Sequence, residues 1–242
     1  MVTSPIRIVT SPARFAAAGM RFSDGYAASP RCTPSRAAIF TGRSPAQLHM
    51  TFVNEGKKDG GVNPGDKVIA PKCTTELPAK IETMATLLKR AGYATAHFGK
   101  WHLGHNLTPD DHYEPRDQGF DVDWPHAPRA AGPGGGYLAP WSKFIKDPPL
   151  DAPAGTHIEE RMAEEAAKYI HANKGRPFFV NYWAYSVHSP WNARKDYIEH
   201  FQKTADAKNP QHNPLYAAMV RSLDDGVGNL LKALDDAGVA DN

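Results

Sequence analysis

Hydrophobic positions recur at helical spacing in three long segments of the chain. Within residues 78–92, apolar side chains at i, i+3, i+4 and i+7 predict a helix with one apolar face and a glycine at its end: Ile81, Met84, Ala85, Leu88 and Gly92. The same spacing predicts helices over residues 158–172 and 215–236, and the inner face of the second is formed by Met219, Leu223, Val227, Leu230, Leu231 and Leu234. Shorter helices are expected over residues 14–19 and 35–41, each closed by a glycine.

Other apolar residues form short runs that are typical of strands. Residues 93–98 predict a short strand with alternating apolar and polar positions, and residues 21–30 predict a strand and a loop. The dense apolar run PFFVNYWAY, residues 177–185, is typical of a buried central strand. Because helical and strand patterns alternate, we expect an α/β fold with a largely parallel central sheet flanked by helices, in one domain over residues 1–242. Long loops are expected over residues 53–72 and 106–153.

Composition narrows the class of protein without naming a function. The 242 residues are 41% hydrophobic and 22% charged, as in ordinary globular domains. A net charge of +2 gives no reason to expect a nucleic-acid or membrane partner, and no apolar run approaches the roughly 20 residues of a membrane span. No secretory signal is visible at the start of the sequence. Two cysteines, Cys32 and Cys73, make at most one disulfide and no Cys-x-x-Cys redox motif.

Cys32 stands just before a proline that is well suited to start a helix, in the string Cys32-Thr33-Pro34-Ser35-Arg36. A helix N-terminus offers free N–H groups and positive partial charge, which suit a thiolate or an anionic substrate. Arg36, one turn further on, can donate hydrogen bonds to anionic oxygens. A lone cysteine beside a helix is more often a buried structural residue, so the local chemistry leaves both interpretations open.

Residues 92–104, GYATAHFGKWHLG, place Lys100 and His102 in a tight turn after a predicted strand. Ligands of α/β folds bind at strand ends, and two residues that are two apart point to the same side of an extended segment. An ammonium group can hold an anionic oxygen, and an imidazole can transfer a proton near neutral pH. The alternative is a solvated lysine and a packed histidine. His97, on the strand itself, is expected to be structural.

His188 comes directly after the buried run, in the string Tyr185-Ser-Val-His188-Ser-Pro-Trp191. A histidine at the end of a strand and beside a proline-restricted turn is well placed to face a site. Taken alone, a single histidine is more often structural.

Together these motifs resemble those of the type I, formylglycine-dependent sulfatases, which include the arylsulfatases and belong to the alkaline phosphatase superfamily. Cys32, Pro34 and Arg36 match the three fixed positions of the Cys-x-Pro-x-Arg signature. Further matches are Thr41-Gly42-Arg43, the second sulfatase signature at residues 92–104, the His-x-Pro at His188, and the segments 14–22, 113–121 and 222–228. The resemblance therefore runs over nearly the whole chain.

The resemblance implies a sulfuric ester hydrolase for aryl or carbohydrate sulfate monoesters. In such enzymes a formylglycine-generating enzyme oxidises the cysteine, and a hydroxyl of the hydrated aldehyde attacks sulfur while the alcohol leaves. Loss of a proton from the other hydroxyl then expels sulfate, and a divalent cation, usually Ca²⁺, assists. The implied roles are nucleophile and metal ligand for Cys32, stabilisation of the nucleophile for Arg36, nucleophile and sulfate contact for Lys100, general base for His102, and contact with sulfate or the leaving group for His188.

The acidic metal ligands of the family have no match in this sequence. The resemblance would place an Asp-Asp pair on a strand before the helix of residues 14–19, but residues 1–12 hold no acidic residue. It would place an Asp-Asn pair on a strand after residues 215–236, and the terminal Asp241-Asn242 is not equated with it. We therefore expect a partial catalytic domain without its first and last metal-bearing strands. Asp24, Asp110 and Asp111 are interpreted as loop residues.

Two alternatives follow from these departures. One is a related hydrolase of phosphate or phosphonate esters with the same fold. The other is a non-catalytic or metal-deficient sulfatase fragment that binds sulfated ligands. The identity of the substrate would be determined by the irregular residues 53–72 and 106–153.

Overall fold

A computed structural model describes residues 11–53, 65, 67–68, 73–104, 113–125, 136–141, 152–204 and 206–241. Its helices are α1 (Ser11–Ala18), α2 (Cys32–Thr41), α3 (Pro45–Leu48), α4 (Met84–Arg90), α5 (Ile158–Asn173), α6 (Lys195–Thr204) and α7 (Pro214–Ala237), with a 3₁₀ helix η1 (Pro115–Gln118). Its strands are β1 (Ala94–Gly99), β2 (Val122–Trp124) and β3 (Phe178–Trp183). Within this described part, none of the helices combines the length and apolar character that crossing a bilayer requires.

The three strands form a parallel sheet in the order β2-β1-β3. The register is such that Ala96 of β1 pairs with Val122 of β2 on one side and with Val180 of β3 on the other. Parallel neighbours need a crossover, and α5 lies in the connection from β2 to β3. The predicted α/β class with a parallel sheet flanked by helices is confirmed. The central described strand, however, is β1, and the run predicted to be central forms β3 beside it.

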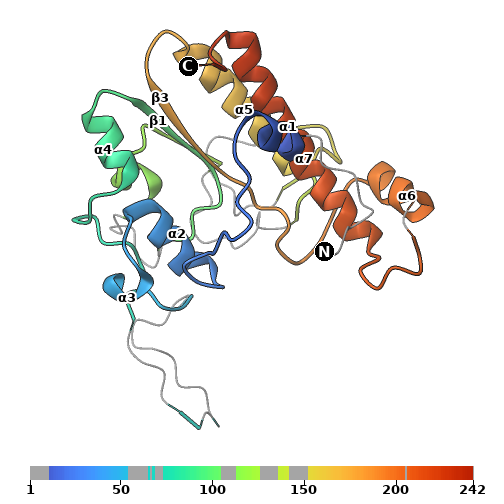
Figure 1. Cartoon of the computed structure of the whole chain (residues 1–242), viewed down its shortest axis with the longest axis horizontal. Helices are drawn as coiled ribbons and strands as arrows, with labels where there is room; N and C mark the ends of the chain where they lie inside the picture. Colours follow the sequence, from blue (N-terminus) through green and yellow to red (C-terminus); the bar gives the residue numbers. More distant parts are fainter. Residues whose placement is uncertain are drawn as a thin grey trace.

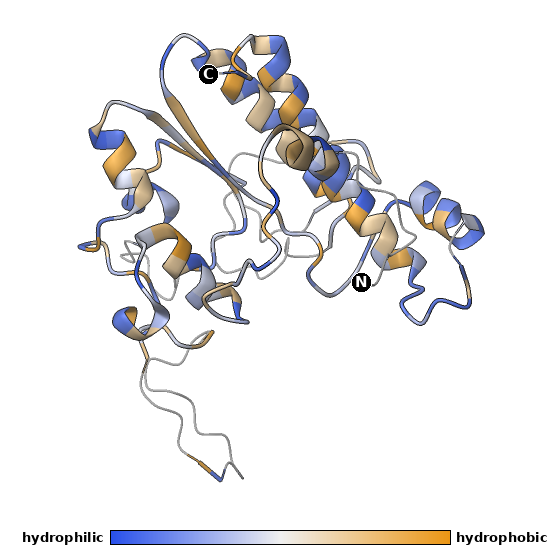
Figure 2. Ribbon diagram, viewed as in Figure 1, coloured by the Kyte–Doolittle hydropathy of each residue, from blue (hydrophilic) through white to orange (hydrophobic). Residues whose placement is uncertain are grey.

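Helices cover both faces of the sheet, as Figure 1 shows, with α2 and α4 on one side and α5 and α7 on the other. Side chains of β3 alternate accordingly: Phe179 and Trp183 pack toward α2 and α4, whereas Val180 and Tyr182 pack toward α5 and α7. Figure 2 shows hydrophobic and hydrophilic positions interleaved along the helices that flank the sheet. The short strand predicted over residues 93–98 is confirmed as β1. All six of its residues are buried, the polar Thr95 and His97 included, because both faces of the sheet are covered.

The helices α1, α2 and α4 begin at residues other than those predicted, and α1 starts at Ser11 and not at Arg14. The helix of the cysteine motif starts at Cys32 and not at Ser35, because the extended Arg31 takes the N-cap position. It ends as predicted at Gly42, whose φ of 68° is left-handed. The helix predicted from residue 78 starts at Met84, where Thr83 and Thr86 form a capping box. Its C-cap is the residue before Gly92.

Other differences concern short elements and buried faces. The predicted loop of residues 106–153 contains η1 and β2, the helices α3 and α6 were not expected, and no strand forms among the described residues 21–30. On α7 only Met219 of the predicted inner face is fully buried, together with small residues such as Gly226. A Cβ on Gly226 would lie 3.2 Å from the Tyr182 hydroxyl, so the small residue permits close packing.

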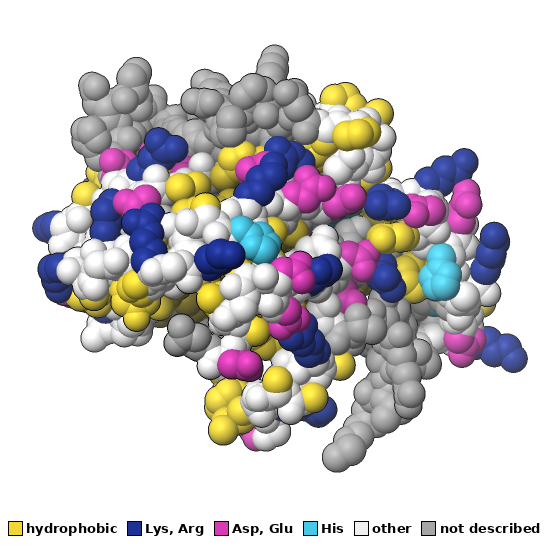
Figure 3. Space-filling model, turned by 90° about the horizontal axis from the view of Figure 1, so that it is seen from above, with side chains coloured by type: hydrophobic (Ala, Val, Ile, Leu, Met, Phe, Trp, Pro, Cys, Tyr) yellow, Lys and Arg dark blue, Asp and Glu magenta, His cyan; other side chains and the backbone are white. Residues whose placement is uncertain are grey.

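Lys and Arg side chains are interspersed with Asp and Glu over the face in Figure 3.

Candidate active site

The first turn of α2 places Cys32 at the start of a helix, with its side chain half-buried. Thr33 is buried, and its hydroxyl donates a hydrogen bond of 2.9 Å to the carbonyl oxygen of His102. This bond joins residues 69 positions apart in the sequence. The cysteine motif and the second signature therefore meet at one place in the fold, which neither motif alone predicts.

Arg36 lies one turn after Cys32 and connects α2 to both neighbouring strands. Its Nη1 donates to the carbonyl oxygen of Lys100 at 2.8 Å, and its guanidinium carbon lies 4.6 Å from the centre of the Trp183 ring. Burial lowers the pKa of Arg36 to about 10, while Cys32 and Tyr185 act in the opposite direction. Arg36 thus stays protonated near neutral pH and brings a partly desolvated positive charge close to Cys32.

Lys100 and His102 occupy the turn that follows β1. The Lys100 N–H donates to the carbonyl oxygen of Trp183 at 2.8 Å, and this bond ties the turn to the end of β3. Both side chains are nearly buried, with 3% of Lys100 and 6% of His102 exposed. His102 has a left-handed φ of 61°, so the expectation that both side chains share one side of an extended segment is wrong at this residue.

His97 is a fully buried histidine on β1. Its Nδ1 lies 3.0 Å from the Asn181 side-chain nitrogen, and its Nε2 lies 3.2 Å from the Gly99 carbonyl oxygen. The ring packs against the aromatic rings of Trp101, Phe120 and Trp183. Burial lowers the pKa of His97 to about 4, so the imidazole is neutral near pH 7. This environment agrees with the structural role expected for it.

His188 lies on the loop of residues 184–194 between β3 and α6, called the His188 loop below. Its side chain is half-buried, and its Nδ1 is 2.5 Å from the Ser189 carbonyl oxygen. Its N–H donates to the carbonyl oxygen of Tyr185, whose phenol is close enough to Arg36 to influence the pKa of the guanidinium. Direct contacts therefore join the elements of Cys32, Arg36, Lys100 and His102, and His188 is on the loop that adjoins them.

The comparison with protein families decides the relationship. The family model described as Sulfatase matches residues 4–242 of this sequence. The chain belongs to the sulfatase family. It is 29% identical to N-acetylgalactosamine-6-sulfatase of Homo sapiens over 252 residues, which cover 98% of this chain and 44% of the human protein. It is 40% identical to an arylsulfatase of Hemicentrotus pulcherrimus over 110 residues, or 45% of this chain and 18% of that enzyme.

Solved structures agree with this sulfatase family fold. The crystal structure of Ps i-CgsB superposes with a TM-score of 0.71 at 26% identity, covering 96% of this chain and 50% of that one. A protein solved in complex with D-glucosamine-2-N,6-O-disulfate gives a TM-score of 0.63 at 18% identity, covering 96% of this chain and 58% of that one, and shares the fold. The chain spans about half the length of the relatives and structures it matches.

The described part of this sulfatase chain does not offer a complete metal site. None of its His, Cys, Asp and Glu side chains come together in a group of three or more that could hold an ion. Asp24 is exposed and accepts a hydrogen bond from Ser23, whereas Asp110 and Asp111 lie outside the described residues. Calcium takes about six or more oxygen ligands, so the described residues do not fit this ion by themselves.

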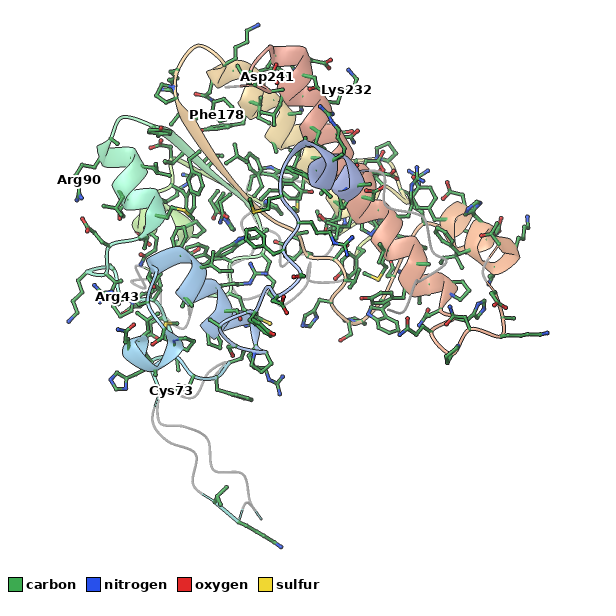
Figure 4. All side chains as sticks on the ribbon, viewed as in Figure 1. Arg43, Cys73, Arg90, Phe178, Lys232 and Asp241 are labelled. Carbon is green, nitrogen blue, oxygen red and sulfur yellow. The ribbon has the colours of Figure 1, made fainter. Side chains whose placement is uncertain are left out.

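The two cysteines are not bonded to each other. Cys32 starts α2, whereas Cys73 lies near α3, where Figure 4 labels it. Sequence reasoning missed two aromatic side chains near Arg36, those of Trp183 and Tyr185. The dense aromatic composition of residues 177–185 was their only signal, and it indicated a buried strand without indicating which rings meet the arginine.

Proposed function

We propose that the protein hydrolyses sulfate monoesters, with a nucleophile formed from Cys32. The observation that carries the proposal is the set of contacts that joins the start of α2 to the Lys100–His102 turn. This set surrounds a helix N-terminus with a half-buried guanidinium and a buried lysine, an arrangement that suits an anionic sulfate group. Membership of the sulfatase family supports the same reaction class.

The proposed roles are those that the resemblance to sulfatases implies, and the contacts between α2 and the Lys100–His102 turn support them. The Arg36 guanidinium stabilises negative charge at the position of Cys32. Lys100 binds the sulfate group, His102 takes up the proton needed for sulfate release, and His188 binds sulfate or protonates the departing alcohol. Oxidation of Cys32 to formylglycine by a formylglycine-generating enzyme supplies, after hydration, a hydroxyl nucleophile that a thiol does not provide.

Calcium is proposed as the metal of the complete site, with the modified Cys32 as one ligand. Since the described residues do not fit the ion by themselves, we assign it no step. A metal-deficient protein that binds sulfated ligands without cleaving them is therefore the second candidate function. Isothermal titration of the purified protein with Ca²⁺ separates the two, because tight binding contradicts a metal-deficient site.

We further propose a sulfated carbohydrate as the substrate. The relatives include N-acetylgalactosamine-6-sulfatase, and Ps i-CgsB has been solved in complex with k-i-k-neocarrahexaose. The similarity to this second structure has a TM-score of 0.67 at 26% identity, covering 91% of this chain and 48% of that one. An aryl sulfate remains useful as a reporter of sulfatase chemistry.

The test compares the wild type with Cys32→Ala, both co-expressed with a formylglycine-generating enzyme. Cys73→Ala is the matched control, because it removes the other cysteine, which lies near α3. We expect 4-nitrophenyl sulfate hydrolysis by the wild type and Cys73→Ala but not by Cys32→Ala, and mass spectrometry should find formylglycine at position 32. Faster hydrolysis of 4-nitrophenyl phosphate than of the sulfate would point instead to a phosphate or phosphonate ester hydrolase.

A further inference from the structure

Glu159 is a fully buried carboxylate for which the proposed reaction has no step. It is the second residue of α5. Its Oε1 accepts hydrogen bonds from the backbone N–H groups of Tyr185 at 2.9 Å and Ser186 at 2.8 Å. Its Oε2 accepts a bond of 3.1 Å from the Tyr182 hydroxyl. A helix on one face of the sheet thus binds the end of β3 and the first residues of the His188 loop.

The burial of this acid is compensated mainly by that loop. Burial raises the pKa of Glu159, and the hydrogen bonds from Ser186, Tyr182 and Tyr185 lower it. Without the carboxylate, the N–H groups of Tyr185 and Ser186 would lose their acceptor in a place from which water is largely excluded. The conformation of the loop backbone at these two residues therefore depends on the side chain of α5.

The hydroxyl of Tyr137 binds the same loop at two of the loop's backbone carbonyl groups. The Tyr137 hydroxyl lies 2.9 Å from the Tyr185 carbonyl oxygen and 2.8 Å from that of His188. The ring of His157 stacks on Tyr137 with 5.4 Å between centres, and the Nδ1 of His157 accepts from the Glu159 N–H. Glu159, which accepts from the loop N–H groups, and Tyr137, which donates to the loop carbonyl groups, are thus linked through His157.

We infer that Glu159 is a positioning residue, whose carboxylate sets the backbone of Tyr185 and Ser186 and thereby the place of the His188 imidazole. The catalytic consequence rests on the proposed function, whereas the effect on the loop does not. The simpler alternative is a buried acid that contributes only to stability. The two differ in one respect: a positioning residue acts through His188, and a residue that acts only on stability does not.

The first measurement is a double-mutant cycle with Glu159→Ala and His188→Ala, assayed on 4-nitrophenyl sulfate. We expect Glu159→Ala to lower kcat/KM by about 10- to 100-fold, the range for a displaced catalytic group. In the His188→Ala background the same change should alter kcat/KM by less than about 3-fold, because the group it positions is gone. Equal fold losses in both backgrounds would overturn the inference.

Two further variants separate positioning from folding. Glu159→Gln keeps an oxygen that can accept both loop N–H bonds, so it should stay within about 5-fold of the wild type. Glu164→Ala on the same helix removes a half-exposed carboxylate and should leave the rate unchanged. A Glu159→Gln variant as impaired as Glu159→Ala would contradict the hydrogen-bonding role.

Amide hydrogen exchange tests the loop independently of activity. The amides of Tyr185 and Ser186 should exchange at least about 10-fold faster in Glu159→Ala than in the wild type and Glu164→Ala. Unchanged exchange in a folded Glu159→Ala protein would overturn the inference. An inactive wild type with this pattern of exchange would refute the proposed function and still support Glu159 as the residue that positions the loop.

Discussion

Replacing Gly99 with alanine should destabilise the protein by about 4 kcal/mol and displace the turn that carries Lys100. Gly99 ends β1 with a φ of 102°, which L residues rarely adopt. An added Cβ would lie 2.1 Å from the Trp183 carbonyl oxygen and 2.9 Å from the Met162 methyl carbon. The same Trp183 oxygen accepts the Lys100 N–H at 2.8 Å, so separating the strands to relieve the clash weakens that bond.

The magnitude combines two effects that a second glycine separates. Positive φ at a residue with a side chain costs about 1–3 kcal/mol, and forcing atoms into a packed site costs about 1–3 kcal/mol more. Gly92 has a similar φ of 89°, but an added Cβ there meets nothing within 4 Å. Gly92→Ala should therefore cost only the backbone strain, about 1–3 kcal/mol.

Urea unfolding of the wild type, Gly92→Ala and Gly99→Ala measures both terms. We expect Gly99→Ala to lose at least about 1 kcal/mol more than Gly92→Ala, and kcat/KM on 4-nitrophenyl sulfate to fall only in Gly99→Ala. Failure of Gly99→Ala to fold under conditions where Gly92→Ala folds would also agree with the steric argument. Equal losses in the two variants would refute it, because backbone strain alone would then account for Gly99.

Three further predictions concern the same region. Stability should fall as the pH drops from about 6.5 toward 4, because the pKa of buried His97 is about 4 and the unfolded state binds the proton first. The stability that His97 contributes and that is lost at pH 5 is about 2 kcal/mol. The free energy of urea unfolding should therefore differ less between pH 7 and pH 5 in His97→Gln than in the wild type. Thr33→Val should cost about 1–2 kcal/mol in the same assay because the buried bond to the Lys100–His102 turn is lost. Thr41→Val should cost less, because its part-buried hydroxyl makes only local bonds, to the Ala37 carbonyl oxygen and from the Arg43 N–H. Arg36→Lys should lower kcat/KM at least about 100-fold, because an ammonium does not replace the planar guanidinium over the neighbouring indole. Arg90→Lys, which changes an exposed side chain on α4, should leave the rate unchanged.

Long periodic elements could be predicted from sequence, and short paired ones could not. Residues 158–172 gave α5 almost to the residue, because one apolar face repeats over four turns. β2 has only three residues in a segment rich in proline and glycine, and its register is set by pairing with Ala96 and its neighbours on β1. Such a strand forms because a partner is present, so its own residues carry little signal.

The same distinction applies to the candidate site. Cys32, Arg36, Lys100 and His102 stood in recognisable strings, but the contacts that bring the strings together run through backbone carbonyl groups. A carbonyl group is present at every residue, so no residue type indicates which ones will meet.

Glu159 illustrates the limit most clearly. In the sequence it is one of several acids in the string IEERMAEE and looks like the solvated face of a helix. In the fold it is completely buried, because the His188 loop packs against the start of α5 and two of its backbone N–H groups donate hydrogen bonds to the carboxylate. Its neighbour Glu160 remains partly exposed and pairs with Arg194. Glu159 and Glu160 are adjacent and chemically identical, yet their surroundings differ. The parallel crossover through α5 brings Glu159 into contact with Tyr185, which lies 26 residues further along the chain.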